Sequence, residues 1–152
     1  MFVDTSVVVA ILSGEEDAGE WSNRIEAAPA RITSALVVLE AAMRLSTMLA
    51  VPPVVAGDAI EAFLREAEIE IVPIDASYAK LAIHAFSDYG KGRGHPAQLN
   101  LADCLSYACA KSHGSALLYN GNDFSHTDLA YPQSAVTSPV RSIEAAPLPP
   151  PR

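Results

Sequence analysis

Phe2-Val3-Asp4-Thr5-Ser6 places a single carboxylate directly after a short apolar run near the N-terminus. The run before Asp4 reads as a strand, and the residues after Ser6 are again apolar, of the kind that is normally buried. A buried carboxylate is unfavourable unless it is hydrogen-bonded, paired or bound to a metal. In an open parallel sheet, ligands gather outside the carboxyl ends of the strands. We therefore expect Asp4 at a functional edge of a sheet; the open alternative is that it only caps the following helix.

The composition indicates one domain. The chain has 152 residues, half of them apolar, which allows a core without disulfide or metal staples. Cys104 and Cys109 lie five positions apart in one predicted helix, so their side chains point apart and we expect free, buried thiols. Asp4 interrupts the first apolar run, and no later run is long enough to span a bilayer. We expect a cytoplasmic protein without a membrane partner.

The formal net charge is −8, with a pI near 4.8. This charge argues against a protein that holds nucleic acid through a broad basic face. It fits a protein that collects carboxylates at a cation site, or one whose partner is basic. The alternative is that the acidity only keeps the protein in solution.

Strand and helix patterns alternate along the chain. Strands are predicted near residues 2–4, 31–33, 69–74 and 116–119, and helices at about residues 6–12, 17–27, 35–49, 58–68, 76–89 and 101–111. Pro52-Pro53 is expected to break the chain before the fourth helix, and Gly90 to cap the end of the fifth. The alternation indicates βαβ units and a parallel sheet covered by helices on both faces.

The composition changes after Tyr131, because six of the eleven prolines follow it. We expect one short strand near Ala135-Val136 and then a loosely docked or disordered tail. The predicted division is a domain of residues 1–141 and a proline-rich tail of residues 142–152.

Four acids occupy comparable places at the ends of predicted strands and in helices: Asp4, Glu40, Asp103 and Asp123. Each has a simpler explanation, respectively as a helix cap, a solvent-facing residue, a partner of the helix dipole and a turn former. A doubly wound sheet would instead bring all four to one end of a crevice. Clustered carboxylates raise one another's pKa values and persist where a divalent cation neutralises them. Ligands that are all oxygen suit Mg²⁺ or Mn²⁺, whose waters can attack a phosphodiester.

Several short motifs follow one another along residues 1 to about 131. They are Val3-Asp4-Thr5-Ser6, Glu40, Tyr89-Gly90-Lys91-Gly92, Leu99-Asn100-Leu101-Ala102-Asp103-Cys104, Ser106-Tyr107-Ala108, and the run of residues 117–128 from Leu117 to Asp128. In these motifs the chain resembles PIN-domain ribonucleases of the VapC toxin type. The resemblance implies a three-layer αβα fold with a central, mostly parallel sheet of four or five strands. It also implies a metal-dependent endoribonuclease that a cognate antitoxin blocks.

The resemblance assigns Asp4, Glu40 and Asp103 to the metal site. Supporting roles fall to Thr5, Ser6, Asn100 and Asn122. Related toxins often carry an acid where this chain has Asn122, and an amide brings an oxygen but no charge. We therefore place the fourth acid at Asp123.

Lys91 and Arg93 lie in the one basic loop of this acidic chain, just ahead of the helix that carries Asp103. They are expected to hold RNA phosphates, the alternative being a solvated loop. The antitoxin is expected to insert a basic side chain among the acids. Apolar helix residues in the N-terminal half favour a homodimer, although burial in the core explains them equally well.

Two other classes of function remain as alternatives. An inactive PIN fold that only binds a partner protein is favoured by the missing acid at Asn122. A phosphatase of the haloacid-dehalogenase kind would need a second Asp two residues after Asp4, where this chain has Ser6.

Overall fold

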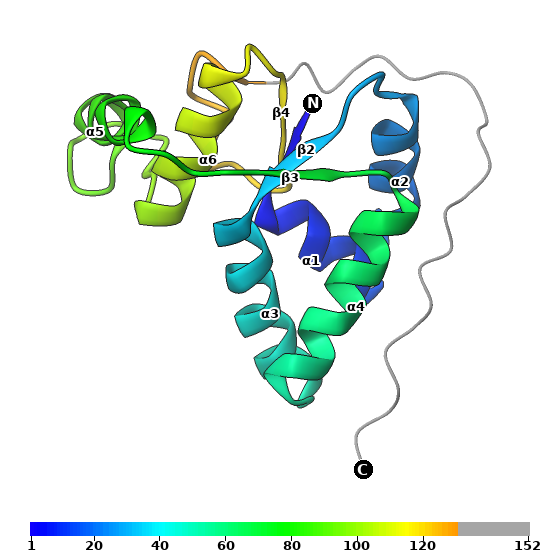
Figure 1. Ribbon diagram of the computed structural model, residues 1–152. Coiled ribbons are helices and arrows are strands. Elements are labelled where there is room, and N and C mark those ends of the chain that lie inside the picture. Colours follow the sequence, from blue (N-terminus) through cyan, green and yellow to red (C-terminus); the bar gives the residue numbers. More distant parts are fainter. Residues whose placement is uncertain (131–152) are drawn as a thin grey trace.

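The computed structural model describes residues 1–130 of the chain (Figure 1). Four parallel strands form one sheet in the order β3-β2-β1-β4. The strands are β1 (Phe2–Val3), β2 (Ile32–Ser34), β3 (Glu70–Val72) and β4 (Leu117–Leu118). The chain starts in the middle of the sheet, adds β2 and β3 on one side, and returns to add β4 on the other. The predicted parallel α/β sheet is confirmed, and the winding reverses between β1 and β4.

Six helices surround this sheet. They are α1 (Thr5–Ser13), α2 (Ala18–Ala27), α3 (Ala35–Leu49), α4 (Pro53–Glu66), α5 (Ser77–Tyr89) and α6 (Leu101–Ser112). In the view of Figure 1, α5 and α6 lie on the left of the strands, and α2 and α4 lie on the right. The main helix pairs are α5 with α6, α3 with α4, and α1 with α3. No helix within residues 1–130 has the length and apolar character needed to cross a membrane.

Strands β1 and β4 are short but completely buried. Phe2 and Val3 of β1 pair with Leu117 and Leu118 of β4, and none of these side chains is more than 1% exposed. Strands that are apolar on both faces are typical of a parallel sheet covered by helices. The Thr33 hydroxyl on β2 donates to the Val3 carbonyl at 2.9 Å and so satisfies a buried polar group. The buried strands therefore fix the positions of the residues that directly follow them.

The helix predicted from about residue 58 begins earlier, at Pro53. Pro52 occupies the N-cap position and Pro53 the first helical position. A proline suits that position because its fixed φ is already helical and its missing N–H has no partner to lose there. The predicted break is present, since α3 ends at Leu49, and the two prolines also start the next helix.

Gly90 does not end α5 in the left-handed conformation. Its backbone is extended, with φ −68° and ψ 152°, and it forms a parallel bridge with Leu99. A Cβ at this position would lie 2.3 Å from the Phe86 carbonyl oxygen, so only glycine fits. Gly90 is the C-cap residue of α5, and its N–H donates to the Phe86 carbonyl at 2.9 Å. Glycine is needed there for the close backbone approach that closes the basic loop of residues 91–98.

Cys104 and Cys109 are free and buried, as predicted. The strand predicted at Ala135-Val136 and the boundary between residues 141 and 142 lie outside the described residues.

Candidate active site

Asp4 follows β1 directly and is the N-cap of α1, with φ −82° and ψ 160°. Its Oδ2 accepts hydrogen bonds from the Ser6 backbone N–H at 3.1 Å and the Ser6 hydroxyl at 2.7 Å. The residue is 5% exposed. Asp4 therefore caps a helix and also stands at the carboxyl edge of the central strand, so the two interpretations of this residue are compatible.

Ser6 links Asp4 to the neighbouring strand end. Its Oγ donates to Asp4 and accepts from the Asn120 backbone N–H at 2.9 Å. The Asn120 side chain donates to Glu15 Oε2 at 3.2 Å. Asn120 was not predicted as a site residue from the sequence. Its position directly after a fully apolar strand indicated a strand end. Placing it beside Ser6 also required knowing that β1 and β4 are neighbours in the sheet.

Glu40 is brought to Asp4 by the packing of α1 against α3. The Thr5 hydroxyl donates to Glu40 Oε2 at 2.7 Å, across 35 positions of sequence. Glu40 is half-buried rather than on the exposed face of α3. Thr5 and Ser6 thus each orient a different carboxylate.

Asp103 lies in the first turn of α6 and is 9% exposed. The Asn100 side-chain oxygen accepts from the Asp103 backbone N–H at 3.0 Å. In return, Asp103 Oδ2 accepts from the Asn100 backbone N–H at 2.8 Å. This reciprocal pair is a capping box. Asn100 thereby caps α6 and fixes the direction of the Asp103 carboxylate.

Burial raises the pKa of Asp103 to about 6, although the hydrogen bond from the Asn100 N–H opposes this shift. The charges of three other acids raise it further, and these acids are Asp4, Asp123 and Glu40. Asp103 is therefore near enough to Asp4, Asp123 and Glu40 for their charges to act on it. The crevice between β1 and β4, where the winding reverses, is therefore an acidic site.

Asp123 and Asn122 lie in the turn after β4, and both are exposed. The Asn122 carbonyl accepts from the Ser125 N–H at 3.1 Å and from the Ser125 hydroxyl at 2.6 Å. Asp123 is close enough to the crevice to influence Asp103.

Lys91 and Arg93 are exposed in the loop that precedes α6. The base of this loop is closed by Lys91 N–H to the Leu99 carbonyl and by Leu99 N–H to the Tyr89 carbonyl, both at 2.9 Å. Arg93 lies over the Phe86 ring at 5.3 Å. The loop therefore projects from the same end of α6 that carries Asp103.

The acids fit a hard divalent cation by their chemistry, because all the donors are oxygens and their charges repel one another. Two basic side chains are paired with other acids: Arg31 pairs with Glu68, and Lys111 pairs with Asp128. Within residues 1–130, no three His, Cys, Asp or Glu side chains stand close enough to form a ready metal-binding group. Two of the carboxylates bond instead to the hydroxyls of Thr5 and Ser6.

Residues 1–129 match the family model of the PIN domain. The chain is 42% identical over 127 residues to VapC ribonuclease Mb0625 of Mycobacterium bovis, which covers 84% of this chain and 93% of that relative. This chain is a PIN-domain protein of the VapC ribonuclease family. A second VapC relative, the ribonuclease VapC30 of Mycobacterium tuberculosis, is 40% identical over 130 residues, or 86% of this chain and 96% of that protein.

The VapC fold is also seen in the crystal structure of Mycobacterium tuberculosis VapC20, described as a sarcin-ricin loop cleaving toxin. The two folds superpose with a TM-score of 0.65 over 84% of this chain and 94% of VapC20, at 20% sequence identity. At this identity the likeness bears on the fold alone. It supports the PIN-like α/β architecture expected from the sequence.

Proposed function

We propose that this VapC-family chain is an endoribonuclease toxin that cleaves RNA with the help of a divalent metal ion. The observation that carries the proposal is the burial of two carboxylates, Asp4 at 5% and Asp103 at 9% exposure, at the end of β1 and the start of α6. Burial and the neighbouring carboxylates raise the pKa of Asp103. Such a site is unfavourable without a cation, and the family relatives are ribonucleases. The proposed site of action is the cytoplasm, where RNA and the antitoxin are made.

The proposed metal ligands are Asp4, Glu40 and Asp103, with Asp123 as the fourth acid. The proposed ion is Mg²⁺, with Mn²⁺ as the alternative, and when bound it neutralises charge on the phosphate and activates water for hydrolysis. Thr5 and Ser6 orient two of the carboxylates by hydrogen bonds of 2.7 Å each. Asn100 holds Asp103, and Asn122 offers an uncharged oxygen beside the fourth acid.

Binding of Mg²⁺ is expected to stabilise the folded protein. An ion present at about 100 times its dissociation constant adds roughly 2.7 kcal/mol, which corresponds to a rise in melting temperature of roughly 5–10 °C for a chain of this size. Thermal unfolding in EDTA and in increasing Mg²⁺ or Mn²⁺ measures this shift. Asp103→Asn is expected to abolish most of the shift, whereas Asp58→Asn, an exposed acid on α4, is the matched control and keeps it. Equal shifts in both variants would rule out the proposed metal site.

Lys91 and Arg93 are proposed to contact the RNA backbone. They are exposed, and their loop begins beside the α6 end that carries Asp103. Changing both to Ala is expected to weaken binding to all RNAs alike, because phosphate contacts carry no sequence information. Each lost contact lowers the slope of log affinity against log salt by about 0.7 for single-stranded RNA.

The measurement is RNA affinity across a salt series, with an inactive Asp4→Asn background to prevent cleavage. A double variant of Arg65 and Lys80, which are exposed cations on α4 and α5, is the control for loss of charge alone. The same affinity and slope in the Lys91/Arg93 variant and in the parent would make this a solvated loop.

The proposed partners are a cognate antitoxin and a second copy of this chain. The acidic crevice and the net charge of −8 support an antitoxin that inserts an arginine, whose planar fork pairs with carboxylates. Leu39 and Met43 on α3 are 58% and 61% exposed, and such an apolar helix face supports a homodimer.

A further inference from the structure

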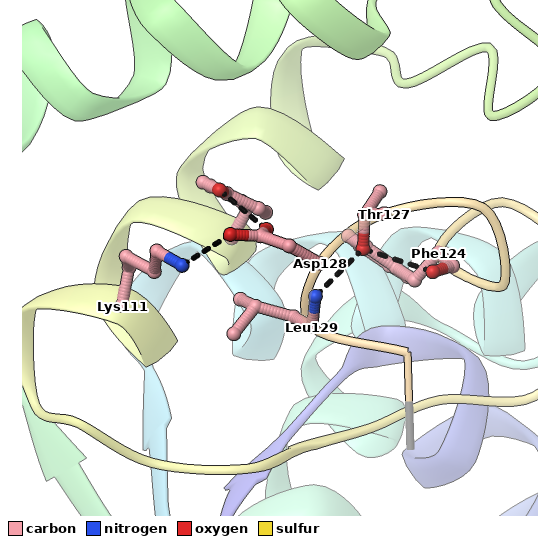
Figure 2. Close-up of polar contacts among 6 residues, drawn as sticks. Lys111, Phe124, Thr127, Asp128 and Leu129 are labelled. Atoms are coloured by element: carbon pink, nitrogen blue, oxygen red, sulfur yellow. Dashed lines mark hydrogen bonds and ion pairs between the residues drawn. The ribbon is translucent and has the colours of Figure 1, made fainter. Parts of the chain in front are cut away.

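Asp128 forms a second polar cluster on the same helix that carries Asp103. Its carboxylate accepts a hydrogen bond from the Tyr107 hydroxyl at 2.7 Å. It also forms an ion pair with Lys111 Nζ (Figure 2). Asp103, Tyr107 and Lys111 are spaced by four residues on α6, so they follow one stripe of this helix. One helix face thus carries a proposed metal-site acid at its N-terminal end and a docking point for Asp128 further along.

This cluster is more than a surface ion pair. Tyr107 is 7% exposed, and burial together with its bond to Asp128 raises the pKa of its hydroxyl. Partial burial alone would raise the pKa of the Asp128 carboxyl, but the hydrogen bonds from Lys111 and Tyr107 lower it instead. The Asp128 carboxylate is thus held by two groups, the buried Tyr107 hydroxyl and the Lys111 ammonium. Together these two contacts define one position for the carboxylate.

Asp128 ends the same turn that carries Asp123. The turn is attached at its start by the Asn120 N–H to Ser6 Oγ. In its middle, Phe124 is 2% exposed and its ring packs on Tyr119, with the ring centroids 5.3 Å apart. Near its end, the Thr127 hydroxyl donates to the Phe124 carbonyl at 2.9 Å (Figure 2). Asp123 is exposed between these attachments, so its place depends on both ends of the turn.

We propose that Asp128 is a positioning residue, which holds the turn against α6 so that Asp123 faces Asp103. This inference rests on the proposed nuclease function and adds a residue that the sequence motifs did not assign. The carboxylate of Asp128 acts through the backbone of the turn and touches neither RNA nor metal. Misplacement of a reacting group by about 1 Å can reduce a rate by about 100-fold.

The first variant is Asp128→Asn, which keeps an acceptor for the Tyr107 hydroxyl but removes the charge that pairs with Lys111. The second is Tyr107→Phe, which removes only the hydroxyl. Each is expected to lower kcat for RNA cleavage by about 10–100-fold with little change in KM, as is typical when the support of a metal ligand is lost. Glu68→Gln breaks the ion pair with Arg31 at the far edge of the sheet and is the matched control.

A double-mutant cycle separates positioning from general stability. If Asp128 acts through Asp123, then Asp128→Asn has almost no further effect on kcat in an Asp123→Asn background. Full additivity of the two losses would overturn the proposal. Wild-type protein that cleaves no RNA contradicts the nuclease function and not the positioning itself.

Hydrogen exchange tests the positioning without any cleavage. The Ser125 and Thr127 amides donate within the turn, to the carbonyls of Asn122 and Phe124 at 3.1 and 3.0 Å. Both amides are expected to exchange faster in Asp128→Asn and Tyr107→Phe than in wild type and Glu68→Gln. Unchanged protection of these amides in both variants would show that Asp128 does not hold the turn.

Discussion

Asp103→Asn is expected to reduce RNA cleavage at saturating Mg²⁺ by about 100-fold or more. A metal ion contributes several kcal/mol of transition-state stabilisation, and about 1.4 kcal/mol corresponds to a factor of ten in rate. The amide keeps the shape and the hydrogen bond to the Asn100 N–H but removes one proposed ligand charge. The measurement is single-turnover cleavage of cellular RNA. Activity equal to wild type in a preparation free of other nucleases would remove Asp103 from the metal site.

The same variant is expected to be more stable than wild type when metal is absent. The pKa of Asp103 is about 6 in the folded protein, against an ordinary value of 3.8 that applies to the unfolded chain. The folded protein therefore binds the Asp103 proton more tightly than the unfolded chain does. The stabilisation is therefore fully present below pH 4 and is lost as the pH rises from about 4 through 6. The loss amounts to at most about 3 kcal/mol, since one pKa unit corresponds to about 1.4 kcal/mol.

Urea unfolding in EDTA between pH 4 and 7.5 measures this effect. The difference in unfolding free energy between Asp103→Asn and wild type is expected to grow in favour of the variant as the pH rises through 6. Because carboxylates far from the site titrate alike in both proteins, the difference between the two curves reports Asp103 together with its coupling to the neighbouring acids. Curves that stay parallel would mean that the Asp103 carboxyl is not held at an elevated pKa.

The second large effect is expected in cells. Expression of the chain alone should arrest growth, and co-expression with the small protein encoded beside it should restore growth. The inserted arginine is expected to form charge-assisted hydrogen bonds with the acids around Asp103, each worth roughly 1.5–3 kcal/mol. Changing that arginine to Ala should therefore weaken the purified complex by more than about tenfold.

Asp4→Asn is the control for this experiment, because a folded but inactive chain should leave growth unaffected with or without the partner. A chain that binds its partner tightly but is harmless when expressed alone would instead be the catalytically inactive binding module considered from the sequence.

Much of the fold was predictable because β1 and β4 are wholly apolar and because strand and helix patterns alternate along the chain. Helix α6 shows this well, since a helix was predicted at about residues 101–111 and it begins at Leu101, directly after the N-cap Asn100. The start of α4 was missed because a proline pair signals both a break and a helix N-terminus. Gly90 caps the end of α5 as predicted, but its extended backbone and its close approach to Phe86 are visible only in three dimensions.

The candidate site was predictable residue by residue but not in its connections. The places of Asp4 and Asp123 follow from strand ends, which local patterns indicate. The bonds from Thr5 to Glu40 and from Asn120 to Ser6 join residues 35 and 114 positions apart. Such links depend on which helices and strands become neighbours, and that order is a property of the whole sheet.

Cleavage of total cellular RNA by the purified, antitoxin-free chain is the most direct test of the proposed metal-dependent nuclease. The reactions contain Mg²⁺, excess EDTA, or EDTA followed by excess Mg²⁺, each with wild type and with Asp4→Asn shown to be folded. We predict cleavage by wild type in Mg²⁺, none in EDTA, recovery when Mg²⁺ is returned, and none by Asp4→Asn. Cleavage that persists in EDTA, or that is equal in Asp4→Asn, would contradict a metal-dependent site built on these acids.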